Sequence, residues 1–156
     1  MSESVRPTSV TVIGWAWVVV GFWMAIAGAG GLLTSSFMGA ATFFSAPFEW
    51  VFPAGLAFQV VAGASGVVLG ASLLRLVRWA YFGIQWLIGL VLLYIGAIAL
   101  FLFWMAFTGF VAGSYLMAGG VLAVGLWTAA ASGIPLVLML RSLRKEPVRA
   151  LFAAPV

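Results

Sequence analysis

The sequence predicts an all-α, multi-pass membrane protein in which four transmembrane helices form a bundle. Three observations support this fold class. Hydrophobic residues make up 65% of the 156 residues and charged residues 6%, whereas a soluble domain carries roughly 25% charged residues. The apolar residues fall into four long stretches, and the basic residues lie between or beyond them. Such a composition cannot cover a water-facing surface, but it suits helices that face lipid.

The first predicted span covers residues 9–33 and follows a short polar tail, residues 1–8. About 25 uncharged residues can cross a hydrocarbon core of ~30 Å with some tilt. This stretch is longer than the ~7–15 apolar residues of a signal peptide, so we expect it to be retained. The aromatic-rich connection 34–53 carries Glu49, and we expect it to lie in the membrane interface, where Ser45 would cap a short helix if one forms. A loop that re-enters the membrane is the alternative.

Three further spans are predicted, over residues 54–74, 79–107 and 114–140. A tight basic turn joins the second span to the third, and residues 108–113 form a short outer turn. Pro135 is expected to kink or loosen the fourth span near its inner end, because proline removes a backbone hydrogen bond. Residues 141–156 are predicted to form a basic tail.

The basic residues predict the orientation of the spans. They precede the first span, separate the second from the third, or follow the fourth: Arg6, Arg75, Arg78, Arg141, Arg144, Lys145 and Arg149. All of them fall on one side of a four-span topology, whereas three spans would divide them. Cytoplasmic segments carry the excess of Lys and Arg, so both termini are predicted to be cytoplasmic. We expect anionic lipid headgroups to contact five of these residues: Arg75, Arg78, Arg141, Arg144 and Lys145.

Two short motifs occur twice at similar offsets. Gly-x-x-Trp begins at Gly14 and again at Gly83, and Leu-Arg-x-x-Arg begins at Leu74 and again at Leu140. A duplicated hairpin would explain both and would give two tandem helical hairpins, as in some transporters. Coincidence within a simple apolar sequence is the alternative explanation.

Small residues recur at regular spacing in the predicted spans. In lipid no hydrophobic effect drives helices together, so close backbone packing must stabilise their association. The candidate packing residues are Gly14, Gly21, Gly28, Ala62, Gly66, Gly70, Gly89 and Gly96. They predict either the packing of the chain's own four helices or the binding of another subunit, which would be a second copy or a larger membrane complex.

The composition excludes several kinds of chemistry. The chain has no Cys and no His, which removes disulfides, thiol chemistry and the commonest ligands of zinc and haem. Three Glu and no Asp cannot build a carboxylate cage or a catalytic carboxylate pair in the spans. We therefore expect no cofactor, no metal and no enzymatic activity. The net charge of +4 comes without a long basic stripe, so no nucleic-acid partner is expected.

Two functional hypotheses follow. The first is a non-enzymatic membrane subunit or scaffold that packs through its Gly-rich helix faces. The alternative is a small channel or carrier for a neutral or weakly polar solute, with Gln59, Gln85 and Glu49 as polar contacts. An interhelical hydrogen bond is the commoner role of a membrane glutamine. The layout is typical of small bacterial membrane proteins, so the expected location is a cell membrane, the bacterial inner membrane.

Overall fold

The computed structural model describes residues 8–38 and 51–153, and the regular structure within them is helical. The helices are α1 (Thr8–Met38), α2 (Val51–Leu74), α3 (Arg78–Val111), α4 (Tyr115–Leu143) and α5 (Glu146–Ala153). The first four are long and apolar enough to cross a bilayer. This confirms the all-α prediction with four candidate spans, and it indicates a chain in contact with lipid.

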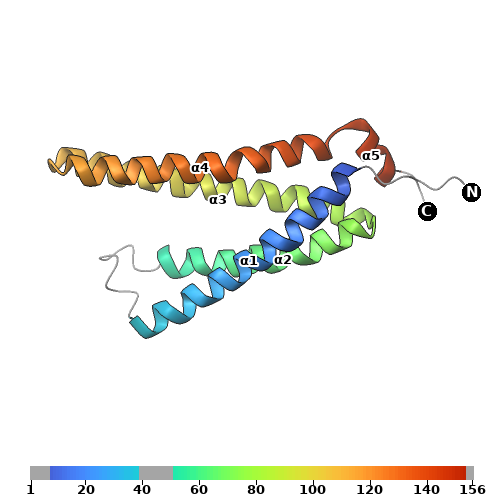
Figure 1. Cartoon of the computed structure of the whole chain (residues 1–156), viewed down its shortest axis with the longest axis horizontal. Helices are drawn as coiled ribbons and strands as arrows, with labels where there is room; N and C mark the ends of the chain where they lie inside the picture. Colours follow the sequence, from blue (N-terminus) through green and yellow to red (C-terminus); the bar gives the residue numbers. More distant parts are fainter. Residues whose placement is uncertain (1–7, 39–50, 154–156) are drawn as a thin grey trace, which may run out of the picture. The chain divides into compact units, whose positions relative to one another are not determined.

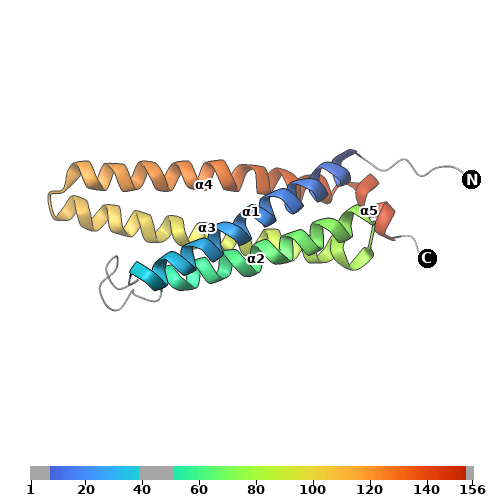
Figure 2. The same ribbon diagram turned by 60° about the horizontal axis from the view of Figure 1, so that its bottom comes forward.

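The described residues form two compact units. The first unit contains α1, α2, the start of α3 up to Leu87, and α5 from Pro147, and the second unit is Ile88–Glu146. In the first unit, α1 and α2 cross at a shallow angle as an antiparallel hairpin (Figure 1). In the second unit, the remainder of α3 and α4 form another hairpin (Figure 2). The helices thus pack as two hairpins.

The connection predicted over 34–53 is partly helical. α1 continues to Met38 and α2 begins at Val51. Three hydroxyl groups donate to carbonyl oxygens of the preceding helical turn at 2.8–2.9 Å: Thr34 to Gly30, and Ser35 and Ser36 to Leu32. These bonds satisfy the hydroxyls within the helix, so polar residues do not end it. Glu49 and the predicted interfacial helix with its Ser45 cap lie outside the described residues.

The turn between α2 and α3 is a Schellman motif. The Val77 N–H donates to the Ser72 carbonyl at 3.1 Å, and the Leu76 N–H donates to the Leu73 carbonyl at 2.9 Å. Leu76 adopts a left-handed backbone conformation with φ 58°. Glycine normally occupies this position, because a Cβ clashes there with the backbone. The tight turn is therefore made with a strained leucine.

The turn between α3 and α4 is also a Schellman motif with the same hydrogen bonds, but glycine occupies its left-handed position. The Ser114 N–H donates to the Gly109 carbonyl at 2.9 Å, and the Gly113 N–H donates to the Phe110 carbonyl at 3.1 Å. Gly113 has φ +80° and carries no strain. The Phe110 and Tyr115 rings approach to 6.0 Å across this turn.

The predicted tail 141–156 contains helical structure. α4 continues past Pro135 to Leu143, so the proline does not end the helix. A short helix, α5, begins at Glu146 and has Pro147 in its first turn, where proline is tolerated. Val148 and Phe152 are buried and lie four residues apart, on one face of α5. Packing of this face explains why a polar segment folds into a helix.

Buried apolar side chains are concentrated in the first unit. They lie on α1, α2, the start of α3 and α5: Val10, Ile13, Trp17, Ala62, Leu73, Ala80, Tyr81, Ile84, Leu87, Val148 and Phe152. The second unit has fewer: Ile88, Val91, Ala106, Ala118 and Leu143. Many large apolar side chains on all four long helices are exposed. Such surfaces require an apolar surrounding such as lipid.

Candidate functional site

The backbones of α1 and α2 approach each other closely at the predicted glycine series. A Cβ atom built on Gly21 would lie 2.6 Å from the Gly63 carbonyl oxygen, and one on Gly28 would lie 2.8 Å from the Leu56 carbonyl oxygen. A Cβ on Gly14 would lie 2.7 Å from the Leu74 side chain. The structure thus places all three α1 glycines against α2, and at Gly21 and Gly28 the nearest atoms belong to the α2 backbone, which leaves no room for a side chain.

The opposing glycines of α2 form reciprocal pairs with those of α1. A Cβ on Gly63 would lie 2.5 Å from the Gly21 carbonyl oxygen, and one on Gly70 would lie 2.7 Å from the Gly14 carbonyl oxygen. Each Cα–H therefore points at a carbonyl of the facing helix, which is the geometry of weak Cα–H···O contacts. The pairs Gly14–Gly70 and Gly21–Gly63 define the register of the hairpin.

Gly63 is a packing residue that sequence reasoning missed. The predicted α2 series contained Ala62, Gly66 and Gly70, at four-residue spacing. Gly63 lies seven residues before Gly70, and the α1 glycines are also seven residues apart. In an antiparallel pair this shared spacing requires the second contact once the first is known. The shared seven-residue spacing can be seen in the sequence. The register that pairs Gly63 with Gly21 cannot.

Trp17 covers the small residues beside these pairs. It is 2% exposed, and a Cβ on Gly66 would lie 2.8 Å from its indole ring. Ala62 is also buried in this part of α2. The Trp17 indole N–H is buried and has no hydrogen-bond partner among the described residues. An unpaired buried donor costs about 1–3 kcal/mol, so the fit of the ring against glycine must offset this cost.

The predicted packing residues of α3 lie in a different environment. A Cβ on Gly89 or on Gly96 would meet no other described atom within 4 Å. A Cβ on Gly83, by contrast, would lie 2.6 Å from the Leu69 side chain of α2. Within the second unit, the series of Gly89 and Gly96, seven residues apart, is thus open, whereas α2 covers the α1 series within the first unit.

The two copies of the Gly-x-x-Trp motif are not equivalent in the structure. Trp17 is 2% exposed within the α1–α2 hairpin, whereas Trp86 is 76% exposed. A Cβ on either glycine would first meet a leucine side chain of α2, but one on Gly14 would also lie 3.2 Å from the Gly70 carbonyl oxygen, whereas one on Gly83 would meet only Leu69. The shared motif therefore does not mark equivalent packing positions in two hairpins.

The two predicted amide contacts lie at different depths. Gln59 and Gln85 are both half-buried. Gln59 lies about four helical turns before the end of α2, and Gln85 lies about two turns after the start of α3. Because α2 and α3 are joined by a tight turn, these distances place the two amides at different levels. The third predicted polar contact, Glu49, lies outside the described residues.

The predicted headgroup cations are all exposed at helix ends. Arg75 and Arg78 flank the turn between α2 and α3, and Arg141, Arg144 and Lys145 end α4 and precede α5. Arg149 is exposed on α5. Within the described residues the only carboxylate side chain is that of Glu146, and it forms no ion pair with them.

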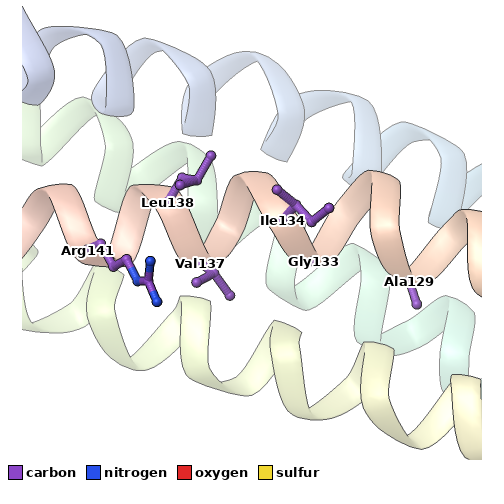
Figure 3. Close-up of a pocket in the computed structure, with 6 residues that line it drawn as sticks. All are labelled: Ala129, Gly133, Ile134, Val137, Leu138 and Arg141. Atoms are coloured by element: carbon purple, nitrogen blue, oxygen red, sulfur yellow. The ribbon is translucent and has the colours of Figure 1, made fainter.

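A hollow of about 350 Å³ lies beside the C-terminal half of α4. Its lining comes from that helix alone: Ala129, Gly133, Ile134, Val137, Leu138 and Arg141. Figure 3 shows Ile134 and Leu138 on one side of the helix, and Val137 and Arg141 on the other. These side chains do not converge on a common point, and the only polar side chain is the Arg141 guanidinium. A site for a polar solute needs several converging polar groups, so the hollow lends the carrier hypothesis no support.

Comparison of the chain with protein-family models, with curated proteins and with solved structures finds no match. The features that bear on function are therefore those of the chain itself. They are the covered glycine pairs of α1 and α2, the open glycines of α3, and the exposed cations at the helix ends.

Proposed function

We propose that this protein is a non-enzymatic, multi-pass membrane subunit that assembles with a second copy of itself or with another membrane protein. Its two termini lie in the cytoplasm, and its exposed cations face that leaflet of a cell membrane. The observation that carries the proposal is the open glycine series of α3, Gly89 and Gly96, around which no described atom lies within 4 Å of an added Cβ.

The α1–α2 hairpin shows that glycines at this spacing allow two helices of this chain to pack closely. There a seven-residue glycine spacing lets two backbones approach until a methyl group no longer fits between them. Close approach of this kind is a main source of helix association in lipid, where apolar surface alone gives no driving force. The same spacing on an uncovered face of α3 supports association with a further helix.

Assembly in native nanodiscs, read out by native mass spectrometry, tests the proposal. The wild-type chain should appear as an oligomer or with a second polypeptide at fixed stoichiometry. The double variant Gly89→Leu/Gly96→Leu should lose that species, because two leucines would hold the facing helix away. Gly21→Leu would not serve, since Gly21 lies in the chain's own hairpin.

Gly30→Leu provides the matched control. Gly30 is also open, with no described atom within 4 Å of an added Cβ, but it has no glycine seven residues away. This variant adds the same side chain and should keep the assembly. A wild-type chain that is only monomeric, or a double variant that assembles normally, would contradict the proposal.

A further inference from the structure

The C-terminal helix α5 is seated on the start of α3. The Phe152 ring stacks on the Tyr81 ring with centroids 4.8 Å apart and an interplanar angle of 16°. Phe152 is 5% exposed, and Val148, one turn earlier on the same face, is also buried. The apolar face of α5 is thus occupied within the first unit. It is not free to insert into a membrane, and the opposite, polar face of α5 meets the surroundings.

Three exposed arginines of the first unit are near Tyr81 or Phe152 in the sequence. Arg149 precedes Phe152 by one helical turn, and Arg78 precedes Tyr81 by one helical turn. Arg75 lies just beyond, in the turn between α2 and α3. None of the three forms an ion pair with a described residue. The stack therefore anchors the helix that carries Arg149 to the first turn of α3, which begins at Arg78 and directly follows the turn that contains Arg75.

We propose that α5 and the α2–α3 turn form a binding surface for the phosphate groups of anionic phospholipids, with Arg75, Arg78 and Arg149 as the ligands. This inference rests on the membrane location in the proposed function, but it does not depend on assembly. Guanidinium groups bind phosphate with two parallel hydrogen bonds, which gives them geometric selectivity for such groups.

The position of the surface along the helices favours a lipid as the occupant. Arg75 follows one candidate span and Arg78 begins the next, so both cations lie at the depth where a span ends. Trp79, beside Arg78, is 55% exposed. Exposed tryptophans at the ends of spans are typical of the headgroup layer. Lipid phosphates are concentrated in that layer, and the charge of the surface is complementary to them.

Phe152 acts in this surface as a positioning residue. It carries no charge and contacts Tyr81, yet it determines whether Arg149 is held near Arg78 or is carried on a detached tail. A pre-organised cation loses less conformational freedom on binding than a mobile one. The lipid preference should therefore depend on an apolar side chain that cannot itself contact phosphate strongly.

Lipid retention by the full chain tests the inference. The protein is reconstituted in nanodiscs that contain equal amounts of phosphatidylglycerol and phosphatidylcholine with the same acyl chains. Lipids that remain bound after release are counted by native mass spectrometry. Wild type should retain phosphatidylglycerol preferentially. Arg149→Gln should reduce this preference by about fivefold, which corresponds to ~1 kcal/mol per charge near a membrane surface.

The aromatic stack is tested with variants that leave the charge unchanged. Phe152→Ala should lose as much of the preference as Arg149→Gln does, and Phe152→Tyr should retain it, because a tyrosine ring can still stack. Leu151→Ala is the control, since Leu151 is a half-buried neighbour on the same helix that takes no part in the stack. Arg149 is exposed, so its variant stays informative if the Phe152→Ala chain folds poorly.

Equal retention of the two lipids by wild type would overturn the inference. So would an unchanged preference in Arg149→Gln, or a co-purified acidic polypeptide bound in place of phosphatidylglycerol. The same spectra report the oligomeric state separately. A monomer with a clear, Arg149-dependent lipid preference would support this surface while contradicting assembly through α3.

Discussion

At the scale of single residues, the Gly21–Gly63 pair shows how little space separates α1 from α2. A methyl group on Gly63 would lie 2.5 Å from the Gly21 carbonyl oxygen and 2.6 Å from the Ala25 backbone nitrogen. Both atoms belong to the backbone of α1, so no side-chain rotation can relieve the clash. The two helices would have to separate, and the contacts around them would weaken together.

We therefore expect Gly63→Ala to destabilise the hairpin by about 1–3 kcal/mol, the usual cost of overpacking. Gly30→Ala is the matched change on α1, where the added carbon meets no described atom within 4 Å. It should be neutral or slightly stabilising, because alanine favours a helix. Unfolding in mixed detergent micelles, followed by circular dichroism, measures both. Equal midpoints for the two variants would show that the helices can separate without cost.

At the scale of elements, the two tight turns offer a direct comparison. Both are Schellman motifs with the same hydrogen bonds, but Leu76 occupies the left-handed position in one and Gly113 occupies it in the other. A left-handed conformation costs a non-glycine residue about 1–2 kcal/mol. The turn between α2 and α3 therefore stores strain that the turn between α3 and α4 does not.

Exchanging the residues at these two positions tests that strain. Gly113→Leu should lower stability by about 1 kcal/mol, because it introduces the strained conformation. Leu76→Gly should lower it less or raise it, since relief of strain offsets the greater chain entropy of glycine. Thermal unfolding of the purified chain in detergent gives both values. A Leu76→Gly chain that is the less stable of the two would mean that the half-buried leucine side chain outweighs its backbone strain.

The two hairpins also show which helices of this chain could be predicted from sequence. Long uncharged stretches predict the four candidate spans, because length and hydropathy are local properties. α5 was missed, because its sequence is short and its apolar face is explained only by the packing of Phe152 on Tyr81. α1 continues beyond the predicted span 9–33 to Met38, and the Thr34 hydroxyl bonds to the Gly30 carbonyl of its own helix.

The candidate site was predictable only where spacing alone identifies a face. The α1 series was visible in the sequence, but its partner Gly63 depends on the register between two helices. Open Gly89 and covered Gly21 likewise look alike in sequence, and so do exposed Trp86 and buried Trp17. Which of two similar residues is covered is a property of tertiary packing, which periodicity does not contain.

At the scale of the whole molecule, the proposed topology places the ends of α4 on opposite sides of a membrane. α4 has 29 residues, which gives a length of ~43 Å at 1.5 Å per residue. This exceeds the ~30 Å of a hydrocarbon core, so one crossing with some tilt is expected. The basic residues near this helix lie at its α5 end, and the turn between α3 and α4 has none, which predicts that the α5 end is cytoplasmic.

Cysteine labelling measures this topology without background, because the native chain contains no cysteine. Ala112 in the turn between α3 and α4 and Ala150 on α5 are both exposed. A membrane-impermeant thiol reagent should label Ala112→Cys in intact cells, and it should label Ala150→Cys only in inverted vesicles. The four basic residues at this end, Arg141, Arg144, Lys145 and Arg149, would then face the anionic cytoplasmic leaflet, as the lipid surface around Arg149 requires. Labelling of both variants from one side would show that α4 does not cross, and it would remove the basis for the even number of spans.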